Sequence, residues 1–241
     1  MRITRVYFPE PIHSGQQVIL PSDSAHHVAT VLRMKVDDRI SLFNPQAGEF
    51  LAHIVAVKKG DVELSVNERI TTFREPELGI VLCLGISRGD RMDFGIQKSV
   101  ELGVSEIRPF YSEYGDIRIK PQDRVEKKTR HWQKIAVSAA EQCGRLDVPV
   151  VAAPTEFSSC LEASPDSTAL LDPRGDGALS RLEFSDRIHL FIGPEGGFSD
   201  SEIEAARNRG CAVVKLGPRI LRTETAPIAA LAILQNRFGD M

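Results

Sequence analysis

Residues 191–198, with the sequence FIGPEGGF, join two elements whose patterns differ. The apolar run 188–192 that ends there is typical of a strand buried on both faces. Ser199-x-x-Glu202, directly after residue 198, is a capping box that begins a helix. Glycines allow positive φ angles and a close approach of the backbone to a ligand. Because ligands of open α/β sheets bind outside the carboxyl ends of the strands, this turn is a candidate binding loop, and a tight strand–helix turn without a ligand is the equal alternative.

Strands and helices alternate around this segment over residues 73–241. The sequence predicts strands at 80–86, 104–110, 148–152, 168–171, 188–192 and 212–216, and helices at 92–102, 121–143, 199–210 and 225–238. This alternation is typical of an α/β domain with a mainly parallel sheet. The glycine spacing matches neither G-x-G-x-x-G nor G-x-x-x-x-G-K-[ST], which disfavours a nucleotide-dependent oxidoreductase.

The residue pattern before position 73 is different from that of the α/β segment. Short β-type runs at 40–43, 50–57 and 62–66 are separated by turn residues. One helix is predicted over residues 25–34, with Asp23 or Ser24 as its cap. We therefore predict a small β-barrel-like domain, 1–72, a linker within 71–79, and an α/β domain, 73–241.

A second candidate loop, LGPRILRTETAP at residues 216–227, also follows a strand and precedes a helix. This one loop contains Arg219, Arg222 and Glu224. Either Thr223 or Thr225 could cap the helix, but capping needs neither arginines nor a carboxylate. A third cluster, EQCGR at residues 141–145, ends the long helix, where an arginine could simply complement the helix dipole.

The composition is that of an ordinary globular protein: 241 residues, 42% hydrophobic and 26% charged, with a net charge of -3. Binding to nucleic acid must therefore use local patches of positive charge, such as the Lys- and Arg-rich run 118–134. The alternative is that this run is only a solvated helix face. The four cysteines form no C-x-x-C pair, so no metal is expected. Without an apolar leader or a long apolar run, the expected location is the cytoplasm, with no membrane partner.

Three motifs, FIGPEGGFSDSEI, LGPRILRTETAPIAAL and SAAEQCGR, together resemble the bacterial 16S ribosomal RNA uridine-N3 methyltransferases of the SPOUT class. RVYFPEP, HVATVLRMKVDD and SRGDRMDFGIQKSVELGV support the resemblance, which extends over residues 5–240. Only the segment 155–167 matches nothing.

The resemblance implies a PUA-like RNA-binding barrel followed by an α/β domain with a trefoil knot. It implies a homodimer in which ribosomal RNA, naked or in the small subunit, reaches across subunits. S-adenosylmethionine would lie in the knot, held by three loops without a metal. On this sequence the donor-binding residues are Leu171, Ile192, Gly193, Glu195, Gly196, Gly197, Leu216, Gly217, Ile220 and Leu221.

Methylation at N3 of uridine requires loss of the N3 proton, which spreads negative charge onto the flanking carbonyl oxygens. Arg222 is the candidate that stabilises this charge. Glu224 or Glu141 is the candidate proton acceptor. The candidate RNA contacts are Arg5, Arg33, Arg88 and Arg145. Two alternatives are a methyltransferase that acts on transfer RNA or on ribose, and a noncatalytic RNA-binding assembly factor. The intact glycine and arginine loops disfavour the assembly factor.

Overall fold

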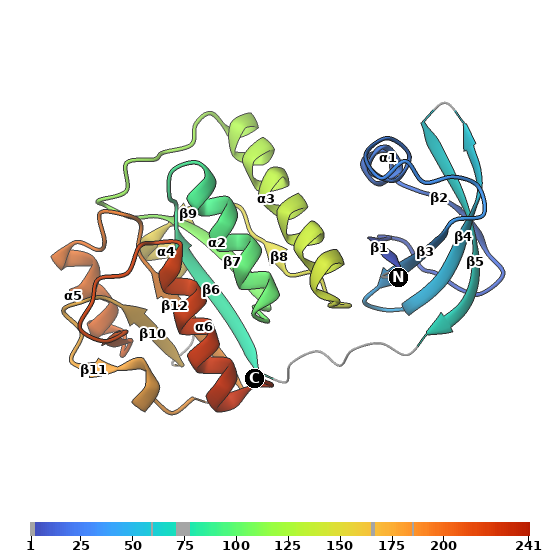
Figure 1. Ribbon diagram of the computed structural model, residues 1–241. Helices are drawn as coiled ribbons and strands as arrows, with labels where there is room; N and C mark the ends of the chain where they lie inside the picture. The colour runs from blue at the N-terminus through green and yellow to red at the C-terminus, as the bar shows by residue number, and fades with distance from the viewer. Residues whose placement is uncertain (1–2, 59, 71–77, 165–166, 185) are drawn as a thin grey trace. The chain divides into compact units, whose positions relative to one another are not determined.

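The structure, a computed structural model, describes residues 3–58, 60–70, 78–164, 167–184 and 186–241 (Figure 1). Two compact units divide the chain: one contains residues 1–75 and 140–148, and the other contains 76–139 and 149–241. The second stretch of the first unit, 140–148, falls within the predicted α/β domain. Most of the predicted linker 71–79, with the predicted boundary at residue 72, lies outside the described residues.

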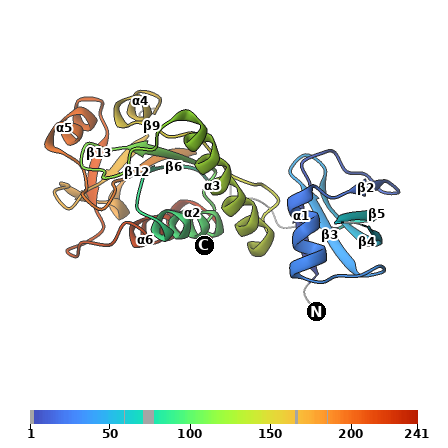
Figure 2. The same ribbon diagram turned by 90° about the horizontal axis from the view of Figure 1, so that it is seen from above.

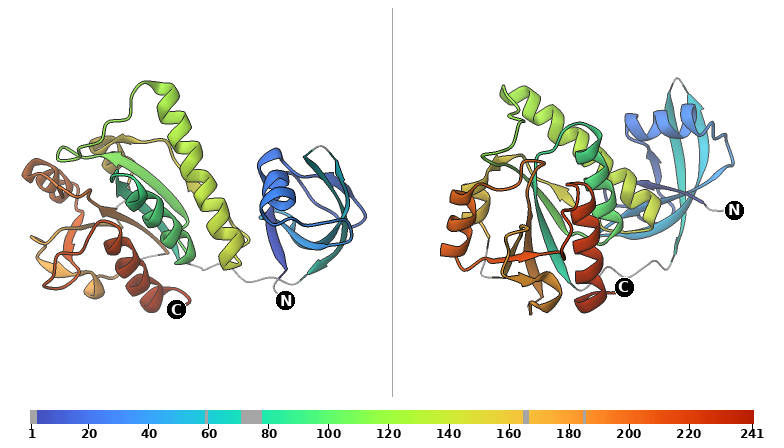
Figure 3. Two further views of the ribbon diagram at one scale, coloured as in Figure 1. Left: turned by 45° about the horizontal axis from the view of Figure 1, so that its top comes forward. Right: turned by 60° about the vertical axis from the view of Figure 1, so that its left-hand side comes forward.

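The first unit is built on a strongly curved five-stranded sheet (Figure 3). Its strand order is β1 (Thr4–Tyr7), β3 (Arg39–Asn44), β4 (Gly48–Lys58), β5 (Asp61–Ile70) and β2 (Gln17–Ile19). The β1–β3 pair is parallel, and the other strand pairs among the described residues of this sheet are antiparallel. Alternate residues of the long strands, among them Ile54 and Leu64, are completely buried in one apolar core. The three predicted strands are confirmed, and β1 and β2 are additional.

The helix of the first unit differs from the prediction. It consists of α1 (Ser22–His26) continued by a π-helical turn (His27–Val31). Its N-cap is Pro21, so the prediction that Asp23 or Ser24 is the cap is wrong. The helix ends before Arg33, whose φ of 55° is incompatible with a right-handed helix.

An eight-stranded sheet forms the second unit, and all its strand pairs are parallel. The order is β11 (Gly177–Ala178), β13 (Ala212–Lys215), β10 (Thr168–Leu171), β12 (Arg187–Ile192), β6 (Gly79–Gly85), β7 (Glu106–Tyr111) and β8 (Val150–Val151), and β9 (Thr155–Glu156) also pairs with β7. The predicted strands and the predicted α/β class are confirmed. Strands β9 and β11 are additional, because two residues carry no periodicity.

Helices cover both faces of this sheet. Helices α2 (Asp90–Glu101) and α6 (Thr225–Phe238) lie side by side on one face, and α4 (Phe157–Glu162) and α5 (Asp200–Asn208) lie on the other (Figure 2). The long α3 (Gln122–Cys143) buries Trp132 completely. Helix α4 was not predicted. Among the described residues, no helix has the length and apolar character needed to cross a membrane.

Four phenylalanines anchor the turn between β12 and α5. Phe191 is the next-to-last residue of β12, Phe198 is the last residue of the turn, and both pack against Phe110 and Phe157. The rings of Phe110 and Phe198 are stacked, with centroids 6.0 Å apart. Because each buried aromatic ring stabilises the fold by about 1.5–3 kcal/mol, both ends of the turn are fixed in the core.

His189 makes the stability of this sheet sensitive to pH. It is buried in β12, with Nδ1 3.0 Å from the hydroxyl oxygen of Ser164. Burial, reinforced by the guanidinium groups of Arg108 and Arg187, lowers its pKa to about 4. The unfolded chain therefore binds this proton at a higher pH than the folded chain, near 6.5, and protonation favours unfolding.

We expect the free energy of unfolding to decrease by up to about 3 kcal/mol through this group as the pH falls from about 6.5 to 4. The substitution His189→Gln should remove that part of the slope, whereas His13→Gln, at an exposed position, should keep it. Urea unfolding at several pH values measures the difference. Parallel curves for the wild type and His189→Gln would contradict the assignment.

Candidate functional site

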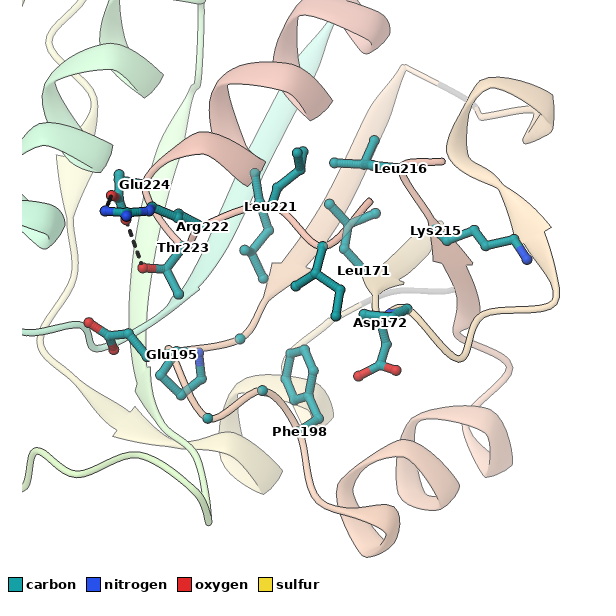
Figure 4. Close-up of a pocket in the computed structure, with 18 of the residues that line it drawn as sticks. Leu171, Asp172, Glu195, Phe198, Lys215, Leu216, Leu221, Arg222, Thr223 and Glu224 are labelled. Carbon is teal, nitrogen blue, oxygen red and sulfur yellow. Dashed lines mark hydrogen bonds and ion pairs between the residues drawn. The ribbon is translucent and has the colours of Figure 1, made fainter. Parts of the chain in front are cut away.

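Three loops of the second unit enclose a cavity of about 710 Å³. They follow β10, β12 and β13, and β10 pairs with both of the other strands. Because the three strands are parallel neighbours, their carboxyl ends meet at one edge of the sheet. We call this space the three-loop cavity. Figure 4 shows Arg222, Glu224 and Glu195 on one side of it and Lys215 and Asp172 on the other.

The three-loop cavity brings together residues that lie more than 50 positions apart in the sequence. All ten predicted donor-binding residues line it, as do Arg219 and the predicted catalytic Arg222 and Glu224. Sequence reasoning did not select several further lining residues, among them Arg91, Tyr114, Arg174, Phe198 and Lys215. Two of them had a sequence signal, because Phe198 lies inside the quoted glycine motif and Arg91 inside the quoted motif SRGDRMDFGIQKSVELGV. The roles of the lining residues remain predictions.

Glycine is required in the β12–α5 loop by contacts within the protein. A Cβ atom on Gly196 would lie 2.6 Å from the carbonyl oxygen of Tyr114, and one on Gly193 would lie 3.1 Å from the ring of Phe198. Gly197 adopts a φ of 70°. The loop therefore presents bare backbone to the cavity while it packs closely on its other side.

The carboxylate of Glu202 fixes the end of this loop. Glu202 is buried, and it accepts hydrogen bonds from the backbone N–H of Ser199 at 2.9 Å and that of Glu113 at 3.0 Å. The hydroxyl of Ser112 also donates to it, at 2.9 Å. The Ser199 side chain accepts from the backbone N–H of Glu202, which completes the predicted capping box. One carboxylate thus joins the start of α5 to the chain after β7.

Arg174 joins the β10 loop to the β12 loop. It donates to the buried carboxylate of Asp172 at 2.7 Å, to the carbonyl oxygen of Phe198 at 2.7 Å and to the carboxylate of Asp200 at 2.6 Å. Burial alone would raise the pKa of Asp172, but the bonds from Arg174 outweigh it and hold that pKa below its ordinary value. Asp172 is therefore ionised and fixed at neutral pH.

Glu195 is the carboxylate of the glycine loop. It accepts from the guanidinium of Arg91 at 3.0 Å and from the backbone N–H of Arg88 at 3.2 Å. Burial would raise its pKa, but backbone hydrogen bonds and the Arg91 charge together lower it. The side chain of Arg88 is exposed and pairs with Asp116 at 2.6 Å.

The β13–α6 loop carries the predicted catalytic pair. The side chain of Arg222 is 78% exposed, and its guanidinium lies 3.9 Å from the Glu224 carboxylate. The hydroxyl of Thr223 donates to the same carboxylate at 3.3 Å (Figure 4). Glu224 is at the N-cap position of α6 without a capping side-chain bond, so the reading of Thr223 or Thr225 as a simple cap is wrong. Arg222 is thus free to contact a ligand.

Four other predicted site residues belong to the first unit and do not line the three-loop cavity. Arg5 pairs with Glu49 at 2.9 Å and donates to the carbonyl oxygen of the buried Arg145 at 2.9 Å. Glu141 accepts from the backbone N–H of Tyr7 at 3.0 Å, and burial raises the pKa of its carboxyl. Arg33 is exposed. Arg5, Arg145 and Glu141 thus have structural roles within their unit.

Two family models match the chain. A sequence model of the RNA methyltransferase domain matches residues 74–235, and one of the RNA methyltransferase PUA domain matches residues 20–67. A ribosomal RNA small subunit methyltransferase E from Buchnera aphidicola (from Schizaphis graminum) is 37% identical over 243 residues, which cover 100% of this chain and 98% of the relative. The Bacillus subtilis protein of that name is 30% identical, covering 93% and 92%.

Solved structures resemble this chain over its full length. A ribosomal RNA small subunit methyltransferase E from Neisseria gonorrhoeae, bound to S-adenosylmethionine, matches with a TM-score of 0.91 and 37% identity. A Legionella pneumophila protein in complex with S-adenosylmethionine matches with a TM-score of 0.95 and 37% identity. Both matches cover 100% of each chain. The resemblance inferred from the sequence and the PUA-like module are thereby confirmed.

The Glu202 bonds predict a selective loss of stability. The substitution Glu202→Ala leaves the N–H groups of Ser199 and Glu113 without their acceptor and removes the Glu202 half of the capping box, and we expect it to lower the free energy of unfolding by about 2–4 kcal/mol. The matched change Glu204→Ala removes an exposed carboxylate from the same helix and should cost less than about 0.5 kcal/mol. Chemical denaturation measures both; equal losses would show that the Glu202 network contributes little.

Proposed function

This chain belongs to the RNA methyltransferase family that includes the ribosomal RNA small subunit methyltransferases E, and on that premise we propose that it transfers a methyl group from S-adenosylmethionine to 16S ribosomal RNA. The resemblance of its motifs assigns N3 of a uridine as the acceptor. The observation that supports this most directly is the assembly of all ten predicted donor-binding residues around one cavity.

The residues around the three-loop cavity fit S-adenosylmethionine. Its volume of about 710 Å³ lies within the range of roughly 300–1,000 Å³ for sites that take a small ligand. Leu171 and Leu221 give it an apolar centre, between polar side chains at its two ends (Figure 4). The apolar centre suits an adenine ring, and the bare backbone at Gly196 and Gly197 allows close contact with a ligand.

When bound, S-adenosylmethionine supplies a methyl group made electrophilic by its sulfonium, so the transfer needs no metal. The task left to the protein is to align the acceptor nitrogen and to favour its deprotonated form. Alignment of two reactants in one site lowers the activation free energy by several kcal/mol. Rigid loops achieve this, and Arg174 and Glu202 make the loops of this cavity rigid.

Arg222 and Glu224 form the proposed catalytic pair. The exposed guanidinium of Arg222 is permanently charged and offers forked donors to the uracil carbonyl oxygens, where charge develops. Glu224 is adjacent and is the proposed acceptor of the N3 proton. Arg219 lines the same cavity, nearer the start of the loop, and is proposed to brace it. Glu141 is a weaker candidate, since its carboxylate already accepts a backbone N–H bond in the first unit.

Substrate RNA is proposed to contact both units. The match to the RNA methyltransferase PUA domain supports RNA contact by the first unit, where Arg33 is exposed. Arg88 is exposed in the second unit. Arg5 and Arg145 are poorer candidates than these two, because their guanidinium groups are almost buried. We propose that this reaction takes place in the cytoplasm, on naked RNA or on the small ribosomal subunit.

We also propose that the protein is a homodimer through its second unit. Helix α6 buries Leu231 and Leu234 but leaves Ile228, Ala232 and Ile233 half-exposed. A helix that is apolar on nearly all sides is buried either in a core or in an interface. The half-exposed apolar residues support the second possibility.

Methyl transfer to ribosomal RNA tests the proposed function. The substrate is 16S ribosomal RNA, naked and within the small subunit, from a strain that lacks this protein. We expect one uridine to become methylated at N3, with undiminished rate in the presence of a chelator. Mapping the modified base identifies the acceptor. Methylation of a ribose or of transfer RNA instead, or RNA binding without transfer, would overturn the proposal.

The substitution Arg222→Ala should slow single-turnover transfer by about 10²–10³, because it removes one preorganised donor to the developing negative charge. Affinity for S-adenosylmethionine and thermal stability should stay near those of the wild type, since Arg222 is exposed. The matched change Arg219→Ala should reduce donor affinity or stability more than the rate at saturation. A near-normal single-turnover rate for Arg222→Ala would assign the stabilising role to another residue.

A further inference from the structure

A second cavity, of about 390 Å³, lies in the second unit against the first half of α3. We call it the α3 cavity. Ile86 follows β6, Ile117 and Ile119 precede α3, and all three line the cavity together with the buried Trp132. Ile117 and Ile119 are half-exposed, and they offer an apolar surface on which a nucleic-acid base can pack.

Cations border the same surface. Arg124, Lys127 and Lys128 line the α3 cavity. Asp93 is the acidic partner on this side, and it pairs with Lys128 at 3.5 Å and with His131 at 2.6 Å. Arg124 and Lys127 are exposed, and no described acidic side chain forms an ion pair with either. The cavity therefore combines an apolar interior with uncompensated positive charge, which suits a group that carries both a ring and a phosphate.

Trp132 supplies a second, independent sign of a ligand. Its side chain is completely buried, yet its indole N–H has no hydrogen-bond partner within the part of the chain that the structure describes. A buried donor without an acceptor costs about 1–3 kcal/mol. Since Trp132 lines the α3 cavity, an acceptor atom on a ligand held there would remove this cost.

The α3 cavity and the three-loop cavity share a stretch of chain. Ser87 and Gly89 line the α3 cavity, whereas Arg91, two residues further, lines the three-loop cavity. Between them, the backbone N–H of Arg88 donates to Glu195 of the glycine loop. Both cavities also lie beyond the carboxyl ends of β6 and β12, which are paired neighbours. One RNA strand that enters the three-loop cavity can therefore reach the α3 cavity with an adjacent nucleotide.

We propose that the α3 cavity binds one nucleotide that flanks the target uridine, with its base against the isoleucines and its phosphate on Arg124 and Lys127. The inference rests on the proposed function, since it names a subsite for the same RNA. Holding a flanking nucleotide fixes the position of the target base, so the α3 cavity would contribute to the choice of uridine.

The sequence offers a direct probe, because Trp132 is the only tryptophan among the 241 residues. Tryptophan emission of the full-length protein, excited selectively over its three tyrosines, therefore reports on this cavity. A short RNA with the target uridine and its flanks should change the emission saturably, at concentrations that match binding measured by anisotropy. Free uridine and adenosine monophosphates, tested separately, show whether a single nucleotide suffices.

Three variants separate a built subsite from general attraction. The substitutions Lys127→Ala and Arg124→Ala should each weaken RNA binding about tenfold, because each removes a charged hydrogen bond to phosphate. Arg130→Ala removes the same charge from an exposed position of α3 outside the cavity, and it should weaken binding less than about twofold. A series of RNAs, each lacking one base, then tests for coupling. Loss of one particular flanking base should weaken binding to the wild type. The same loss should not weaken binding to Lys127→Ala any further.

Equal losses for Lys127→Ala and Arg130→Ala would overturn the subsite in favour of a nonspecific charged surface. Unchanged emission on RNA binding, or the absence of a coupled abasic position, would overturn it as well. A Lys127→Ala protein that binds RNA normally but sediments as a smaller species would assign the cavity to a second copy of the chain. If the wild type binds RNA in this cavity but transfers no methyl group, the proposed function fails and the subsite stands.

Discussion

A carboxylate buried away from water must be surrounded by donors, and that requirement at Glu202 determines the shape of the candidate site. Its oxygens take the N–H groups of Ser199 and Glu113 and the hydroxyl of Ser112. The glycine loop is consequently held at its α5 end and cannot collapse into the cavity. Arg174 provides the complementary link, with donors to Asp172, Phe198 and Asp200. The two charged groups hold a loop of small side chains open.

Much of the second unit could be predicted from local pattern, because its elements are long and internally consistent. The apolar runs of β6 and β12 indicated strands covered on both faces, and the Ser199–Glu202 box marked the start of α5. Strand β9, with two residues, and helix α4, with six, each contain less than two full periods of their pattern and left no such signal. In the first unit the helix ended early because Arg33 takes a positive φ, which nothing in its neighbours indicates.

Prediction of the candidate site from the sequence was limited for a different reason. The glycine and arginine loops were recognisable as loops, and resemblance joined them into one donor site. Which arginine is available for a ligand could not be predicted, because that depends on partners distant in sequence. Arg5 pairs with Glu49, 44 positions away, whereas Arg222 has only its neighbour Glu224 at 3.9 Å. Likewise Gly196 is required by the carbonyl of Tyr114, a contact without any local signature.

The place of β13 in the sheet has a consequence for the order of events during synthesis. This strand lies between β11 and β10, yet it begins only at Ala212, and the loop that carries Arg222 follows it. A nascent chain that stops short of these residues has the first two loops but not the third. Long-range parallel pairing of this kind is also slow to form. A growing chain therefore completes the three-loop cavity only after β13 and the loop that carries Arg222 have been made, however early the glycine loop is synthesised.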